Sequence, residues 1–224
     1  MQAITFLDDS RDPAVKGFLH SPANTIGEAL VLTHGAGSNC NAPLLIALSE
    51  IFAENGYSVL RCDLPFRQKK LTGPPFPGNA ERDRDGLRNA VMALRKNVAG
   101  RIFLGGHSYG GRQATILCAT EHELVSGLLL LSYPLHPPRK PEQLRTQHLP
   151  NLRTPSLFVH GTRDSFGSIE ELRRALHLIP AKSELTAVEA AGHDLGFKGK
   201  ARERDLPAHV FASFANIFDT KVSF

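Results

Sequence analysis

The sequence predicts an α/β fold in which helices cover both faces of a mostly parallel β-sheet. Short aliphatic runs alternate with segments of helical periodicity along the chain. The run ALVLT at residues 29–33 is apolar throughout, as expected for a strand that is buried on both faces. No internal repeat interrupts this alternation, and 224 residues suffice for one sizeable core. We therefore expect one domain that spans residues 1–224.

Eight segments have the short, aliphatic or alternating character of β-strands. The first two are expected to form an antiparallel hairpin at the edge of the sheet. The predicted strands comprise residues 3–7, 15–20, 29–33, 57–62, 102–105, 125–132, 156–160 and 183–189.

Five segments have the pattern of helices. Within residues 42–55, Leu44, Leu48 and Phe52 recur on one face, and Gly56 marks the end of the helix. Other predicted helices carry apolar stripes of the same kind with charged residues outside. The predicted helices comprise residues 42–55, 81–97, 109–120, 169–178 and 206–218.

Composition argues against several classes of protein. The net charge of +4 is small, and a chain with no Trp and three Tyr has little to stack on nucleic-acid bases. Cys40, Cys62 and Cys118 suit reduced thiols better than a disulfide framework, and no His/Cys/Asp cluster has the spacing of a metal site. The N-terminus lacks the pattern of a signal peptide, and no apolar run would span a bilayer. We expect a cytoplasmic protein without cofactor, nucleic-acid or membrane partner, and its oligomeric state is not readable from the sequence.

The stretch IFLGGHSYGGRQATILCA at residues 102–119 begins as a strand and ends as a helix, with Ser108 at the turn. Gly106 and Gly110 stand two residues before and after it, where only small residues let strand and helix pass closely. The turn would lift the Ser108 hydroxyl above the N-terminus of the helix, whose free N–H groups favour a developing negative charge. An incidental serine in a glycine-rich turn is the alternative, which the strand–turn–helix context disfavours. G-x-S-x-G in this context is typical of a nucleophile elbow, so Ser108 is the predicted nucleophile.

A serine nucleophile needs a base, and the base needs an acid to orient it. Of the histidines that follow residue 160, His177 and His209 fall in predicted helices, whereas His193 follows a strand in a glycine-containing loop. Asp164 is the only aspartate between Ser108 and His193 and also follows a strand. Asp194 is a rival acid, but a residue rarely reaches around to its neighbour's imidazole. The predicted triad is therefore Ser108, Asp164 and His193.

Two backbone amides are predicted to stabilise an oxyanion. The sequence THGAG follows the strand at 29–33, where an oxyanion loop of the HG type is expected. The donors would be the N–H groups of Ala36 and of Tyr109, the residue after the nucleophile. His34 is interpreted as shaping the loop, and His107 as packing beside the elbow.

Two proline-rich segments, 64–80 and 132–155, follow predicted strands and are expected to be irregular loops near the site. The second is too short for a helical cap of several elements. Each segment has a local charge of +3, from the bases Arg67, Lys69 and Lys70 in the first and Arg139, Lys140, Arg145 and Arg153 against Glu142 in the second. If both segments flank Ser108, the entrance to the active site would be cationic and would favour an anionic acyl substrate. Two solvated basic loops are the more ordinary interpretation, because charge runs usually lie on the surface.

The four motifs HGAG, GHSYG, HGTRD and GH, in this order, resemble those of the α/β-hydrolase superfamily over nearly the full chain. The wording HGAGS and HGTRDSFG is most similar to the small testis-expressed-type, dienelactone-hydrolase-like branch. The resemblance implies a serine hydrolase fold with a minimal cap. Dienelactone hydrolases proper are associated with a cysteine nucleophile, and Ser108 at the elbow departs from that.

The motifs together favour a cofactor-free serine hydrolase of the carboxylesterase type that acts on a small ester or related acyl substrate. Thioesterase, amidase, peptidase and acyltransferase chemistry would use the same residues, because a fold does not fix the substrate. The alternative is a non-catalytic protein of the same fold that acts as a binding or scaffold module.

Overall fold

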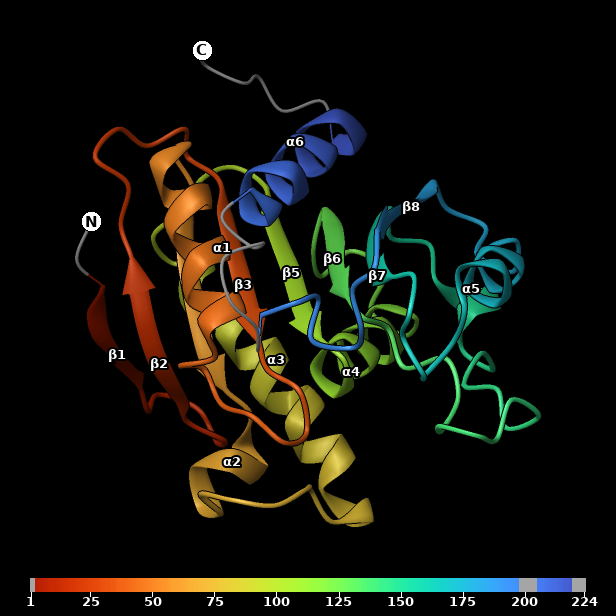
Figure 1. Ribbon diagram of the computed structural model, residues 1–224. Helices are drawn as coiled ribbons and strands as arrows, with labels where there is room; N and C mark the ends of the chain where they lie inside the picture. Colours follow the sequence, from red (N-terminus) through yellow and green to blue (C-terminus); the bar gives the residue numbers. More distant parts are fainter. Residues whose placement is uncertain (1–2, 198–204, 219–224) are drawn as a thin grey trace.

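The computed structural model describes residues 3–197 and 205–218, which contain one eight-stranded sheet (Figure 1). The strands follow the order β1-β2-β4-β3-β5-β6-β7-β8. The antiparallel pairs are β1 with β2 and β2 with β4, and the remaining neighbours are parallel. The predicted edge hairpin and mostly parallel sheet are thus confirmed. The strand bounds are β1 Ile4–Asp8, β2 Val15–His20, β3 Ala29–Thr33, β4 Ser58–Asp63, β5 Ile102–His107, β6 Gly127–Leu131, β7 Ser156–Gly161 and β8 Ser183–Val188.

Helices cover both faces of the sheet, because alternate residues of the central strands point to opposite sides. In β3, Val31 belongs to the core cluster that includes buried residues of α3, α4 and α5, whereas Leu30 and Leu32 belong to the cluster that includes those of α1 and α6. Figure 1 shows α1 and α6 close together, away from α3 and α4. The helix bounds are α1 Pro43–Glu54, α2 Pro65–Lys69, α3 Ala80–Arg95, α4 Tyr109–Cys118, α5 Ile169–Leu176 and α6 Leu206–Phe218.

The segment 64–80 is more ordered than the sequence predicted. It contains the short helix α2 and a 3-10 turn at Pro77–Asn79. Pro65 begins α2, where its missing N–H costs nothing and its fixed φ already suits a helix. The buried side chains of Pro65, Phe66 and Arg67 hold this helix against the body of the protein.

The segment 132–155 contains one 3-10 turn, Leu149–Asn151, and no α-helix. It therefore builds no helical cap, as predicted. No helix within residues 3–197 and 205–218 has the length and apolar character needed to cross a membrane.

A capping box fixes the start of α5, whose N-cap Ser168 lies four residues after Asp164. The Ser168 hydroxyl accepts a hydrogen bond from the Glu171 amide at 3.2 Å, and the Glu171 carboxylate accepts one from the Ser168 amide at 2.8 Å. This reciprocal pair satisfies two amides that the first turn of a helix leaves without partners.

Candidate active site

Ser108 lies at a strained turn between β5 and α4, two elements that Figure 1 labels near its centre. Its backbone has φ 50° and ψ −113°, a region that residues with a side chain rarely adopt. The Ser108 amide donates to the carbonyl of Leu131 at 2.8 Å, which fastens the turn to the neighbouring strand β6. The predicted elbow is therefore present as a local conformation.

Glycines around Ser108 are required by close backbone contacts. A Cβ at Gly106 would lie 2.5 Å from the amide nitrogen of Gly111, and one at Gly110 would lie 2.6 Å from the carbonyl oxygen of His34. Real Cβ atoms do not approach backbone atoms this closely, so these positions exclude larger residues. Strand, turn and helix can pack together only with hydrogen at these positions.

The structure brings the predicted base and acid to Ser108. His193 Nε2 lies 2.8 Å from Ser108 Oγ, and His193 Nδ1 lies 2.8 Å from Asp164 Oδ2. Because a carboxylate only accepts, His193 Nδ1–H donates to Asp164, and Nε2 is then free to accept from the Ser108 hydroxyl. Asp164 follows β7 and His193 follows β8, so both side chains reach the elbow from carboxyl ends of strands.

Asp164 is buried but remains disposed to carry a negative charge. Burial raises the pKa of its carboxyl, whereas the hydrogen bond from His193 and the amide of Phe166, 2.8 Å from Oδ1, lower it. The net effect places the pKa of Asp164 below its usual value. The rival Asp194 instead accepts from the amide of Gly196 at 3.1 Å.

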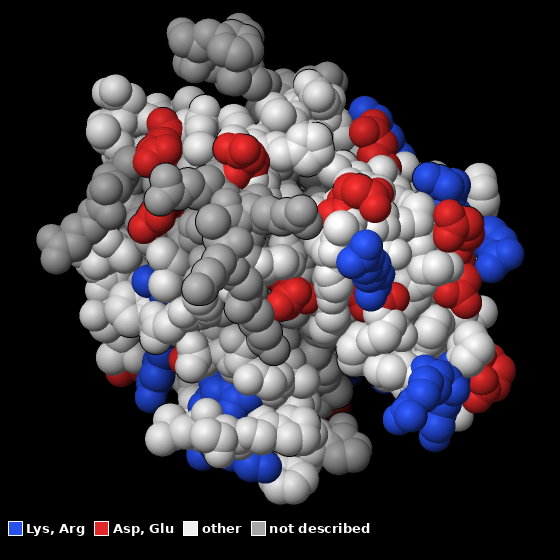
Figure 2. Space-filling model, viewed as in Figure 1, with Lys and Arg blue, Asp and Glu red and all other residues white. Residues whose placement is uncertain are grey.

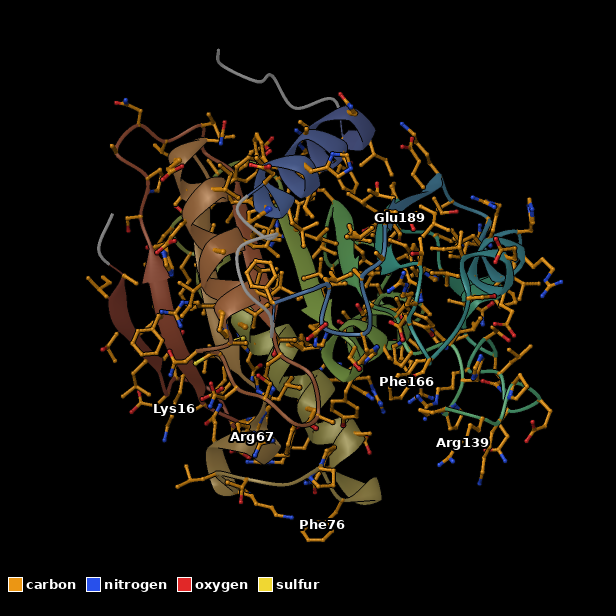
Figure 3. The ribbon with its side chains drawn as sticks, viewed as in Figure 1. Lys16, Arg67, Phe76, Arg139, Phe166 and Glu189 are labelled. Carbon is orange, nitrogen blue, oxygen red and sulfur yellow. The ribbon has the colours of Figure 1, made fainter. Side chains whose placement is uncertain are left out.

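The side chain of Phe166 was not singled out from the sequence, yet it holds the imidazole of His193. The two rings are stacked with centroids 4.1 Å apart and an angle of 28° between their planes. The sequence feature that could have identified Phe166 is its position two residues after Asp164, because a residue so close to the acid lies in the same turn. Figure 3 labels Phe166, which lies in the loop between β7 and α5.

The segment 34–38, which we name the oxyanion loop, approaches the elbow closely. A Cβ at Gly35 would lie 2.9 Å from Nδ1 of His107 and 3.4 Å from Cβ of Ser108. The amides of Ala36 and Tyr109, the two predicted donors, bond to no residue that the structure describes. Both remain available to a ligand beside Ser108.

His34 and His107 support the site as neutral side chains. His34 Nε2 accepts from the Leu64 amide at 3.1 Å, and its Nδ1–H donates to the carbonyl of Gly35 at 2.9 Å. His107 donates to the carbonyl of His193 at 2.8 Å. Burial lowers the pKa of His34, and it lowers that of His107 to about 4. His34 thus shapes the oxyanion loop, as interpreted, and His107 bonds to the loop of His193 in addition to packing beside the elbow.

A cavity of about 500 Å³ opens beside Ser108. Apolar side chains from the start of α1 and from two loops form much of its wall, and Asp194 is the one Asp, Glu, Lys or Arg among the lining residues that the structure describes. Its lining residues are His34, Gly35, Ala36, Gly37, Ser38, Ala42, Pro43, Leu44, Leu45, His107, Ser108, Phe166, His193, Asp194 and Phe197.

The seven bases of the two proline-rich segments do not line this cavity. Figure 2 shows Lys and Arg side chains gathered at the lower left, over α2, and at the lower right, near the loop that Figure 3 marks with Arg139. Lys69, Lys70, Arg139 and Lys140 are exposed, as in the interpretation of solvated loops. Two bases differ from this interpretation: Arg145 is half-buried, and Arg67 is buried and contacts the oxyanion loop.

The remaining residues weighed from the sequence lie elsewhere. His177 at the end of α5 and His209 in α6 are exposed, as expected for residues on helix faces. Cys40, Cys62 and Cys118 are buried free thiols. Within residues 3–197 and 205–218, no group of three or more His, Cys, Asp or Glu side chains is arranged to hold a metal ion.

Comparison with known proteins gives consistent results. One similar solved structure is Est1E from Butyrivibrio proteoclasticus with bound ferulic acid, with a TM-score of 0.76 and 17% identity over 96% of this chain and 100% of that one. A dienelactone hydrolase from Anabaena variabilis has a TM-score of 0.73 and 19% identity over 99% of each chain. A serine hydrolase without lid from Xanthomonas campestris has a TM-score of 0.71 and 13% identity over 96% of this chain and 95% of that one. At these identities the likeness concerns the fold. A family model described as an alpha/beta hydrolase domain matches residues 27–218, and the chain therefore belongs to the α/β-hydrolase family.

Proposed function

We propose that this protein is a serine hydrolase that cleaves esters with an uncharged, largely apolar acyl group. The observation that carries the proposal is the His193 imidazole, which bridges Ser108 Oγ and Asp164 Oδ2 with 2.8 Å on either side. The strained backbone of Ser108 supports it, because such strain is found mainly where function requires it.

The geometry suits a two-step acyl transfer. Ser108 Oγ would attack the ester carbonyl while His193 Nε2 takes its proton, and Asp164 would stabilise the imidazolium. The amides of Ala36 and Tyr109 would donate to the tetrahedral oxyanion. On collapse, His193 would return the proton to the leaving alkoxide, leaving an acyl group on Ser108. Water activated by the same imidazole would then release the acid.

The wall of the cavity supports the choice of acyl group. Ala42, Pro43, Leu44 and Leu45 line it from the start of α1, and Phe166 and Phe197 line it from two loops. Burying the apolar surface of an acyl chain contributes about 25 cal/mol per Å². Asp194 at the wall would repel an anionic group, so the described part of the lining favours neutral esters.

A fluorophosphonate probe tests the proposal directly. The purified protein and Ser108→Ala would be treated with the probe, and the modified residue located by mass spectrometry. We expect label on Ser108 that is absent from the variant, followed by turnover of short neutral p-nitrophenyl esters. A folded protein that remains unlabelled would contradict the proposal and favour a binding or scaffold role.

A further inference from the structure

We propose that Arg67 is the positioning residue of the oxyanion loop and that it keeps the Ala36 amide aimed at the carbonyl that Ser108 attacks. The inference rests on the proposed function and extends it to a side chain outside the cavity. Arg67 belongs to α2, in the segment whose charges the sequence suggested were on the surface.

The environment of Arg67 is unusual for an arginine. Its exposed fraction is 3%, and it forms no ion pair with a carboxylate among the described residues. Instead its guanidinium donates only to backbone carbonyls. Nε donates to Ser38 at 2.7 Å, Nη2 to Ala36 at 2.7 Å and Gly73 at 2.9 Å, and Nη1 to Lys70 at 3.0 Å. A buried charge is tolerated where hydrogen bonds replace its hydration. These bonds tie the oxyanion loop, at Ala36 and Ser38, to the chain that follows α2, at Lys70 and Gly73.

These bonds complete the fixation of the oxyanion loop. A peptide unit is planar, so a bond to its carbonyl also fixes the direction of the following N–H. The Gly35 carbonyl accepts from His34 Nδ1 and from the Ser38 amide at 3.1 Å, which orients the N–H of Ala36. Arg67 then holds the next carbonyl, that of Ala36, and the carbonyl of Ser38 beyond it. The peptide units before and after Ala36 are therefore both held by hydrogen bonds to their carbonyls.

The same short helix also contacts the second predicted donor. The Phe66 amide donates to Asp83 Oδ1 at 3.0 Å, and the Tyr109 hydroxyl donates to Asp83 Oδ2 at 2.8 Å. The rings of Phe66 and Tyr109 pack edge to face with centroids 5.8 Å apart. Helix α2 therefore braces Ala36 through Arg67 and Tyr109 through Asp83.

Arg67→Lys and Arg67→Met test this role, with Lys69→Met as the matched control. Lys69 lies on the same short helix but is exposed, so its replacement removes a charge without touching the loop. Lysine keeps the charge of Arg67 but lacks the planar fork that reaches several carbonyls at once. Hydrogen exchange at 35–38, where the Ser38 amide donates to the Gly35 carbonyl, would be followed by mass spectrometry with β3 as an internal reference. The values of kcat and KM would be measured on a neutral ester.

In both Arg67 variants we expect exchange at 35–38 to become at least tenfold faster while β3 stays protected. We expect kcat to fall about 10- to 100-fold, with KM changing less than threefold, because one oxyanion donor is worth about 10²–10³ in kcat. Affinity for a trifluoromethyl ketone, which forms the tetrahedral adduct, should fall in parallel with kcat/KM, whereas affinity for the product acid should not. Arg67→Lys serves as the folded variant if Arg67→Met does not fold.

Unchanged exchange at 35–38 in a folded Arg67 variant would overturn the proposal. So would faster exchange with a kcat equal to that of Lys69→Met. If the wild-type protein neither labels nor turns over esters while exchange responds as expected, the hydrolase function fails and the holding of the loop by Arg67 stands. The two failures are therefore distinguishable.

Discussion

The strained turn at Ser108 predicts that removing its Cβ stabilises the protein. With φ 50° and ψ −113°, this backbone costs about 1–3 kcal/mol for a residue with a side chain. Glycine adopts it freely but loses about 0.5–1 kcal/mol more conformational entropy on folding than alanine. Ser108→Gly should therefore be about 0.5–2 kcal/mol more stable than Ser108→Ala. Both variants lack the hydroxyl, so their difference isolates the Cβ.

Urea unfolding of the two variants measures this difference. At about 2–4 °C per kcal/mol for a chain of this size, thermal melting gives an independent check. The control is the same pair of substitutions at Ser183 in β8, a residue without positive φ, where glycine should be less stable than alanine by about 0.5–1 kcal/mol. If glycine is as unfavourable at Ser108 as at Ser183, the elbow stores no strain and the reasoning is refuted.

Three further predictions concern the site and its surroundings. Asp164→Asn should lower kcat for ester hydrolysis by about 10³–10⁴-fold, because an amide cannot keep His193 in the required tautomer. A loss of less than tenfold in ester kinetics would argue against Asp164 as the acid that orients His193. Asp194→Asn should raise kcat/KM for an anionic ester about threefold relative to a neutral ester, which is equivalent to ~0.7 kcal/mol of removed repulsion at a water-like dielectric. An unchanged ratio of the two kcat/KM values would show that the charge of Asp194 does not select the substrate. His148 is half-buried in the segment 132–155, and burial lowers its pKa to about 4. The unfolded chain therefore binds the proton first, and the free energy of unfolding falls as pH decreases from about 6.5 to 4. Urea titrations should show a smaller fall in His148→Gln, and equal slopes would contradict this.

The sequence predicted the parts of this protein that depend on local pattern. The strand at 29–33 and the helix at 206–218 have the predicted bounds, because their apolar runs end where the elements end. Ser108, Asp164 and His193 were found because each follows a strand, and carboxyl ends of parallel strands meet at one edge of the sheet. The chemical roles of these residues stay predictions until the probe experiment is done.

Contacts between distant segments were not accessible from the sequence. Arg67 stands in a run of basic residues, and its bonds to carbonyls about thirty positions away distinguish it from the exposed Lys69 and Lys70. The stacking of Phe166 on His193 likewise depends on how two loops fold back toward each other. Patterns of hydrophobicity report which residues face the core, but they do not report which backbone groups a polar side chain meets there.

The capping box of α5 has a consequence for how the proposed activity would be lost on heating. Ser168 and Glu171 fix the first turn of this helix, and the same turn region carries Asp164 and the ring that stacks on His193. Ends of helices open more readily than the core, so fraying here would release the acid while the sheet remains intact. The proposed activity would then depend on this local opening as well as on global unfolding. Heat would then abolish the activity at a lower temperature than the one at which the sheet unfolds, and the loss of activity would report the opening of this one helical turn.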